Sequence, residues 1–352
     1  MNKLWFSKIR KIDPYVPGEQ PNAKNMIKLN TNECPYPPSP MIKKAIEQYD
    51  EDKLRLYPSF KCDELKEALA ETYNVKKRNI FLGNGSDEVI ALCFQTFYNS
   101  EKPILFPDIT YSFYDVWCNL YNIPYECVPL DDEFKIKKED FFRENGGVVI
   151  TNPNAPTGRY MELSELEEII QNNKDVIVIV DEAYIDFGGT SAVSLLQKYD
   201  NLVIVQTFSK SRALAGIRVG YAICSEELVG YLEAVKNSFN SYTLNSLSQV
   251  IATASAKDRE YFNECTQKII NTRERVVSEL SKLGFNTIPS KSNFIFTTNP
   301  NVKAEFIFEE LKKKNIFVRY FKKPRISEYL RITIGTDDEM NSLINELKNI
   351  IK

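Results

Sequence analysis

The sequence predicts an α/β protein: a large domain with a mostly parallel mixed sheet covered by helices, plus a smaller α+β domain. Three observations favour this fold class. In the middle of the chain, short continuous apolar runs alternate with helical patterns, which is typical of strands buried on both faces. Beyond about residue 245, long helical patterns mix with short strands. The length of 352 residues fits about two domains of roughly 150 residues each.

The first 40 residues are rich in Pro, Asn and Lys, and we expect them to be largely extended. A helix is predicted over 39–49, because Ser39 suits the N-cap and Pro40 the first helical position. Its apolar residues at 42, 45, 46 and 49 recur with helical spacing.

The central segment supplies the sheet. Its apolar runs are rich in β-branched residues and do not alternate with polar ones. Predicted strands lie at 79–82, 104–106, 148–150, 176–180, 202–205 and 220–224. A helix is predicted over 88–97, and a capping box of Ser164 and Glu167 predicts the start of another.

The C-terminal segment supplies the smaller domain. We expect a long helix over 255–283, and a final helix from 337 opened by a capping box of Thr336 and Glu339. The remaining predicted elements are a strand at 293–297, a helix at 303–314, and strands at 316–320 and 329–334. The chain is accordingly divided into an N-terminal arm that forms part of the small domain (1–33), a large domain (34–245) and a small domain (246–352).

Composition excludes several classes of function. Lys and Arg total 45 against 48 Asp and Glu, so the net charge of −3 gives no basic field for nucleic acid. The chain has no histidine, which excludes Ser-His-Asp and Cys-His catalysis and His-ligated zinc.

The seven cysteines are widely spaced, with no C-x-x-C pair. We therefore expect neither a disulfide framework nor a metal site, and free thiols fit a reducing cytosol. No apolar run reaches 18 residues, and the first ten residues are too charged for a signal peptide. The expected protein is cytoplasmic, with no membrane or nucleic-acid partner.

A glycine-rich segment at 83–88 follows a predicted strand and opens a predicted helix. Glycines let backbone N–H groups approach a ligand, and a helix N-terminus favours an anion. The functional interpretation is a phosphate cradle. The alternative is an ordinary glycine-rich turn before a capped helix.

Two charged residues follow neighbouring strands. Asp181 ends the most apolar strand, and Lys210 follows the next one with small and hydroxyl neighbours. Each has an ordinary interpretation, as a cap or ion pair and as a surface lysine. Together with the cradle and Arg218, however, they match one ligand with a phosphate, a basic ring nitrogen and an aldehyde, which is pyridoxal 5′-phosphate (PLP).

These segments also carry a resemblance that spans nearly the whole chain. The sequence resembles the fold-type I PLP-dependent aminotransferases, and within them the histidinol-phosphate branch. The Ser-Lys pair at 209–210, with Ala-Gly-x-Arg-x-Gly at 215–220, is specific to the fold, and Pro-Tyr-Val-Pro-Gly at 14–18 to the branch. Further matching segments are 29–33, 56–58, 83–88, 153–158, 181–184 and 330–335.

The resemblance implies a role for individual residues. Lys210 would bind PLP covalently and move the proton, Asp181 would pair with the ring nitrogen, and Tyr184 would hydrogen-bond the ring hydroxyl. Tyr111 would stack on the ring. The phosphate would be held by the backbone of Gly85 and Ser86, by Ser209 and Arg218, and by Tyr57 of a neighbouring subunit in a homodimer. Asp87 of the cradle is also expected among the cofactor-binding residues.

Substrate binding is assigned in the same way. Arg331 would bind the acidic end of the substrate, with Arg319 and Tyr15 helping to bind its phosphate. The chain departs from the family at Ala155, where an Asn that contacts the ring hydroxyl is common. Either Asn154 makes this contact from a shifted loop, or Tyr184 makes it alone.

The reaction implied is transamination of L-histidinol phosphate with 2-oxoglutarate to imidazole-acetol phosphate and glutamate, in histidine biosynthesis. Threonine-phosphate decarboxylases and aromatic amino-acid aminotransferases share the site and remain alternatives. A PLP-binding transcription regulator would need a DNA-binding domain, and the sequence shows no helix-turn-helix and no basic patch. A binding protein with an inactive site is disfavoured because Lys210, Asp181, Tyr184 and Arg331 are all present.

Overall fold

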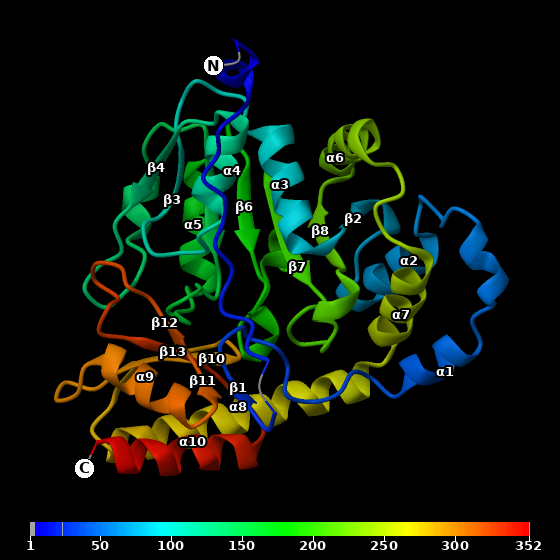
Figure 1. The fold of residues 1–352 in the computed structure, drawn as a ribbon. Helices are drawn as coiled ribbons and strands as arrows, with labels where there is room; N and C mark the ends of the chain where they lie inside the picture. Colours follow the sequence, from blue (N-terminus) through cyan, green and yellow to red (C-terminus); the bar gives the residue numbers. More distant parts are fainter. Residues whose placement is uncertain (1–3, 23, 352) are drawn as a thin grey trace.

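The computed structural model describes residues 4–22 and 24–351. Its centre is a seven-stranded sheet with the spatial order β2-β8-β7-β6-β5-β3-β4 (Figure 1). Strand β8 runs antiparallel to both neighbours, and the other adjacent pairs are parallel. The strands are β2 (Ile80–Gly83), β3 (Ile104–Pro107), β4 (Tyr125–Val128), β5 (Gly147–Thr151), β6 (Val178–Asp181), β7 (Leu202–Thr207) and β8 (Gly220–Cys224). The predicted α/β class with a mostly parallel mixed sheet is confirmed.

The continuous apolar runs are explained by burial on both faces. Val149, Ile179 and Val203 point to one face, whereas their neighbours Val148 and Val178 point to the other. Because successive strand residues alternate between faces, a strand covered on both sides must be apolar throughout. One face packs against α3 (Gly85–Phe97), α4 (Tyr114–Tyr121) and α6 (Glu226–Phe239), and the other against α5 (Leu163–Asn172).

Three helices cover the β2 end of the sheet. They are α1 (Met41–Glu47), α2 (Asp63–Tyr73) and α7 (Ser246–Lys257), and α7 contacts both of the others. The helix predicted over 39–49 is shorter than expected: it begins at Met41 with Pro40 at the N-cap, one residue after the predicted cap. Ser39 Oγ still accepts a hydrogen bond from the backbone N–H of Met41 at 3.1 Å.

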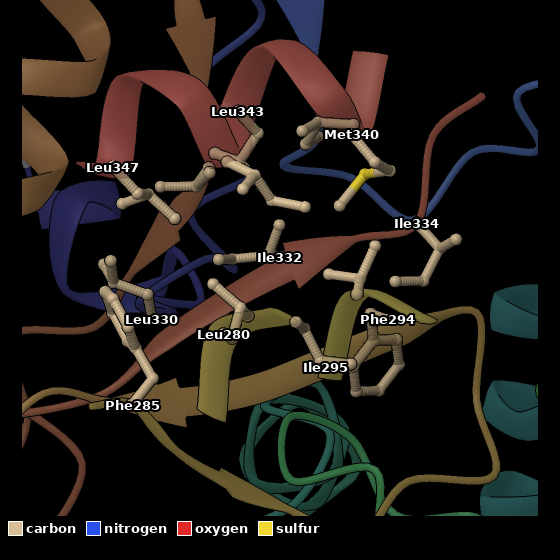
Figure 2. Packing of buried hydrophobic residues seen from close by; sticks show 14 of the residues in the cluster. Leu280, Phe285, Phe294, Ile295, Leu330, Ile332, Ile334, Met340, Leu343 and Leu347 are labelled. Atoms are coloured by element: carbon tan, nitrogen blue, oxygen red, sulfur yellow. The ribbon is translucent and has the colours of Figure 1, made fainter. Parts of the chain in front are cut away.

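A second, antiparallel sheet has the order β12-β13-β10-β9. Its apolar core lies between β10 and β13 and the helices α8 and α10 (Figure 2). Figure 2 shows Met340, Leu343 and Leu347 of α10 pointing toward Ile332 of β13. The elements are α8 (Arg259–Lys282), β9 (Asn286–Ile288), β10 (Phe294–Thr298), α9 (Ala304–Lys313), β12 (Arg319–Tyr320), β13 (Leu330–Thr333) and α10 (Asp337–Ile350).

The N-terminal segment joins the two sheets. It passes along the large sheet toward the four-stranded one (Figure 1). There β1 (Ile27–Lys28) pairs in parallel with β11 (Ile316–Phe317) in a separate two-stranded sheet. The backbone N–H of Thr333 then donates to the carbonyl of Leu29 at 3.0 Å. Residues 29–33 are thereby held between the small sheet and the ends of the large-sheet strands.

Several local predictions were wrong. The helix predicted to open at Ser164 begins at Leu163, because Glu165 rather than Glu167 returns to the chain and accepts from the N–H of Glu162. The helix predicted over 255–283 is broken at Asp258, whose side chain caps α8 by accepting from the N–H of Tyr261.

The strand predicted over 316–320 is also divided. Residues 316–317 pair with β1, whereas residues 319–320 pair with β13, so the chain changes partner at Val318. Strands β4 and β9 were not predicted: both are short and largely exposed, so they lack the apolar pattern. The capping box of Thr336 and Glu339 is confirmed, with the two residues accepting from each other's backbone N–H.

The domain boundary at 245 stays a prediction. In the described part of the chain, no helix is long and apolar enough to cross a lipid bilayer.

Candidate functional site

A cavity of about 170 Å³ opens where several large-sheet strands end. Thr151, Asp181 and Thr207 are the last residues of β5, β6 and β7, and all three line it. This is the edge where open α/β sheets bind ligands. Of the residues predicted from the sequence, eight line the cavity: Ser86, Asp87, Tyr111, Asp181, Tyr184, Ser209, Lys210 and Arg218.

Asp181 places a buried carboxyl group at the floor of this cavity, 3% exposed. It accepts hydrogen bonds from the Tyr114 hydroxyl at 2.8 Å and from the backbone N–H of Ala183 at 3.1 Å. Burial raises the pKa of Asp181 to about 6, although both hydrogen bonds oppose the shift. Asp181 is therefore poised to pair with a buried cationic atom of a ligand.

Lys210 lies in the loop after β7 and reaches the same cavity. Its Nζ donates to the backbone carbonyl of Thr31 at 3.2 Å and lies 5.7 Å from the centroid of the Tyr184 ring. Within the described residues, no carboxylate forms an ion pair with this amine. The loop is held by Thr207, whose hydroxyl donates to Ser209 Oγ at 3.0 Å.

The N-terminus of α3 and Arg218 form one corner of the cavity. Gly85 has a φ of +83°, a backbone conformation that favours glycine, and a Cβ added there would also displace the end of the Arg218 side chain, 2.4 Å away at Nη2. Backbone N–H groups at a helix start and a guanidinium both favour an anion. Gly85 itself lies behind Arg218 rather than on the cavity wall.

Asp87 holds two of the predicted residues. One carboxylate oxygen accepts from Arg218 Nη2 at 3.1 Å, and the other from the Tyr111 hydroxyl at 2.8 Å. Asp87 therefore orients the guanidinium and the Tyr111 ring.

Asn154 does not line the cavity, whereas Ala155 does. The Asn154 side-chain N–H group donates to the Ile109 carbonyl and to Thr157 Oγ1, both at 2.9 Å. Its Oδ1 atom is buried and has no hydrogen-bond partner among the described residues. The amide nitrogen thus ties Asn154 to Ile109 and Thr157.

The two predicted substrate arginines face each other across strands. Arg319 of β12 is the register partner of Arg331 of β13. Arg331 Nη2 donates to the carbonyl of Asn30 at 2.8 Å, whereas its Nε is buried without a partner among the described residues. Burial lowers the pKa of Arg331, and the charge of Arg319 lowers it further.

Tyr15 lies nearby, stacked on Phe113 with 4.1 Å between ring centroids and 6.4 Å from the Tyr111 ring. None of Tyr15, Arg319 and Arg331 lines the cavity itself. Tyr57 is not brought to the site either: it is 82% exposed and stacks on Tyr242 at 4.6 Å.

Sequence reasoning missed several residues at the site. Thr31 and Glu33 line the cavity, and Tyr114 bonds Asp181. Burial raises the pKa of Glu33, but hydrogen bonds from Lys28 and Thr31 outweigh it and leave the pKa lowered. Residues 29–33 are one of the segments that carry the family resemblance. The sequence alone does not place them beside Lys210, because that contact joins distant segments.

Comparisons with known proteins agree with this geometry. The family model "Aminotransferase class I and II" matches residues 24–347. A histidinol-phosphate aminotransferase of Clostridium acetobutylicum is 53% identical over 351 residues, covering 100% of both chains. One from Lactococcus lactis subsp. cremoris is 54% identical over 99% of this chain and 98% of its own.

A solved structure shares the fold. The histidinol-phosphate aminotransferase of Sinorhizobium meliloti, in complex with pyridoxal-5′-phosphate, superposes with a TM-score of 0.84 at 24% identity. The match covers 92% of this chain and 90% of that one.

Proposed function

The chain belongs to the class I and II aminotransferases, and we propose that it transfers the amino group of L-histidinol phosphate to 2-oxoglutarate. The products are imidazole-acetol phosphate and glutamate, and the reaction belongs to histidine biosynthesis. The observation that supports this most is one cavity shared by Lys210, Asp181 and the anion-binding corner at Arg218. Full-length relatives at just over half identity bear the name of this activity.

The residues present fit PLP. Within the part of the chain that the structure describes, neither Asp181 nor Lys210 forms an ion pair: the buried carboxyl group suits the ring nitrogen, and the lysine amine suits the aldehyde. The N-terminus of α3, Ser209 and Arg218 suit the phosphate. When bound, PLP supplies an electron-withdrawing ring and a carbon atom that accepts the amino group.

The protein groups then have distinct tasks. With PLP bound, Lys210 Nζ would hold the aldehyde carbon and would move the proton at the substrate Cα. Asp181 would keep the ring nitrogen protonated, Tyr184 would donate to the ring hydroxyl, and Tyr111 would stack on the ring face. Asp87 fixes Tyr111 and Arg218 rather than contacting the phosphate directly, because its charge would repel an anion.

The facing arginines suit the acidic end of the substrate. Arg331 has an unpartnered buried N–H group, and Arg319 brings a second positive charge to its side. A guanidinium binds phosphate and carboxylate equally well, so one site serves histidinol phosphate and then 2-oxoglutarate. Tyr15 would add a hydroxyl from the N-terminal segment.

A half-reaction tests this function. The PLP-loaded protein, freed of excess cofactor, is mixed with L-histidinol phosphate without any oxoacid, and the visible absorbance of bound PLP is followed. We expect rapid loss of that absorbance as the amino group moves to the cofactor. If only phenylalanine or glutamate produced this change, the protein would be an aminotransferase of another specificity. If none did and O-phosphothreonine released CO₂, the decarboxylase alternative would replace it.

We further propose that the working unit is a homodimer in which Tyr57 reaches the cofactor phosphate of the partner subunit. Support comes from exposed apolar side chains close to Tyr57 in the sequence, Leu54, Leu56 and Phe60, each more than half exposed. Phe239, which is also more than half exposed, precedes Tyr242, on which Tyr57 stacks. Exposed apolar side chains that gather in one patch are typical of an interface. Light scattering should give twice the chain mass of 40.6 kDa, and a monomer with full activity would contradict the proposal.

The same proposal places the enzyme in the cytoplasm, acting on small molecules. Seven cysteines without a disulfide support a reducing compartment.

A further inference from the structure

Residues 30–32 contact, one after another, three residues that we assign to the cofactor or the substrate. The carbonyl of Asn30 accepts from Arg331, and the carbonyl of Thr31 accepts from Lys210. The third contact is made by a side chain: Asn32 Nδ2 donates to the Tyr184 hydroxyl oxygen at 3.0 Å. No role for Asn32 follows from the motif that contains it.

Asn32 is built into its place. It is 1% exposed and has a φ of +58°, a left-handed conformation that Asn tolerates better than most residues. Its own carbonyl accepts from Asn293 Nδ2 at 2.9 Å. The backbone is therefore fixed on both sides of the side chain.

Thr333 determines which way the Asn32 amide faces. Thr333 Oγ1 accepts from the backbone N–H of Asn32 at 3.0 Å, so its own hydrogen is free to go to Asn32 Oδ1 at 3.1 Å. With Oδ1 turned to Thr333, the Nδ2 group must face Tyr184. The orientation thus follows from the hydrogen-bond pattern.

This arrangement directs the Tyr184 hydroxyl hydrogen. The phenol oxygen already accepts from Asn32, so its hydrogen must point elsewhere, and no acceptor among the described residues takes it. Tyr184 lines the cavity, and its ring is wedged edge-on against Phe294 with 5.0 Å between centroids. The hydrogen is consequently available to an acceptor in the cavity.

We propose that Asn32, held by Thr333, is a positioning residue that directs the Tyr184 hydroxyl toward the ring hydroxyl of the cofactor. The inference rests on the proposed function, because it needs Tyr184 to contact that ring oxygen. Two neighbouring residues support it: Ala155 lines the cavity but has no polar side-chain group, and Asn154 does not line the cavity and donates to Ile109 and Thr157 instead. Tyr184 is then left as the donor whose direction matters.

The inference predicts a spectroscopic effect. A hydrogen bond to the ionised ring oxygen favours the deprotonated chromophore, so weakening that bond raises the pH midpoint of its absorbance change. Tyr184→Phe should raise the midpoint of the PLP-loaded protein. Asn32→Gly, which tolerates the left-handed backbone, should raise it by roughly half a pH unit to one unit. Asn32→Asp keeps the shape but removes the donor, and should act in the same direction.

A double variant distinguishes this positioning role from a general loss of order around residue 32. In the Tyr184→Phe background, Asn32→Gly should cause no further shift, because the group through which it acts is gone. Asn74→Gly is the matched control: it is another left-handed Asn, at the end of α2, and should leave the midpoint unchanged.

The outcomes are distinguishable. If Tyr184→Phe shifts the midpoint but neither Asn32 variant does, the positioning role is wrong while the proposed function stands. An Asn32→Gly shift that persists in full without the Tyr184 hydroxyl would also overturn it. If Tyr184→Phe itself has no effect, the ring-hydroxyl contact is wrong and the inference falls with it.

Discussion

Arg319 and Arg331 oppose each other directly across β12 and β13, two positive charges in one cross-strand pair. Like charges in this position destabilise a sheet unless something compensates them. Arg331 also buries an Nε atom without a partner among the described residues. The paired positive charges disfavour folding but suit an anionic substrate. Substitution of one of these arginines is therefore a direct test of substrate binding.

Arg331→Gln should weaken the binding of histidinol phosphate. Loss of a charge-assisted contact in a buried setting costs about 2–3 kcal/mol, which corresponds to a roughly 30- to 150-fold fall in kcat/KM. Steady-state kinetics measure the fall, and most of it should appear in KM. Arg78→Gln, at a guanidinium more than half exposed, is the control. An unchanged KM for Arg331→Gln would place the acidic end of the substrate elsewhere.

Lys210→Ala should abolish the covalent attachment of PLP and turnover together. Among the described residues, no other amine lines the cavity, so none there can replace Lys210 in binding the aldehyde. Borohydride treatment followed by mass measurement detects the linkage: wild type should gain the cofactor mass and the variant should not. Lys198→Ala, at an exposed side chain, should behave as wild type. Normal transamination by Lys210→Ala would refute the assignment.

Asp181→Asn should stabilise the cofactor-free protein at high pH while removing most turnover. The pKa of Asp181 is raised to about 6 by burial, so the folded state binds more protons than the unfolded state between about pH 4 and pH 6. Stability therefore falls as pH rises through this window. At pH 8 the buried charge costs roughly 3 kcal/mol, which the neutral amide avoids.

Thermal melts of cofactor-free wild type and Asp181→Asn at pH 8 and near pH 4 measure this. The variant should melt higher at pH 8, and the difference should shrink toward pH 4, where Asp181 is protonated. A difference that is independent of pH would show that the carboxyl group is not the cause. With PLP bound, the ring nitrogen should compensate the charge, and the advantage of the variant should disappear.

Leu343→Ala should destabilise the small sheet without touching the site. Leu343 is fully buried between α10 and β13, and removing such a side chain from a packed core costs about 2–5 kcal/mol (Figure 2). Denaturant unfolding measures the loss. Asn345→Ala, on the exposed side of the same helix, should change stability little. At temperatures where both variants are folded, kcat should stay near that of wild type.

The strand pattern shows how far local sequence reasoning reaches. Strand β8 matches its predicted range because its run is buried throughout, and burial on both faces leaves a continuous apolar signal. Strand β4 was not predicted because three of its four residues are exposed, so it lacks such a continuous apolar run. Ser164 and Glu167 fit a capping box, but Glu162 and Glu165 occupy those positions in the structure. Short-range patterns permit several registers, and packing selects one.

By itself, the sequence determined the fold class, the family resemblance and the strand-end positions of Asp181 and Lys210. These features can be read from the sequence because they depend on local runs of apolar residues and on the residue types that follow each run. Only the tertiary structure decided that Asn32 meets Tyr184, that Arg319 opposes Arg331, and that Asn154 turns away. Such contacts join segments up to 152 residues apart, as between Asn32 and Tyr184, and they form only when both sheets have packed. A local sequence pattern does not indicate which distant residue a side chain will contact.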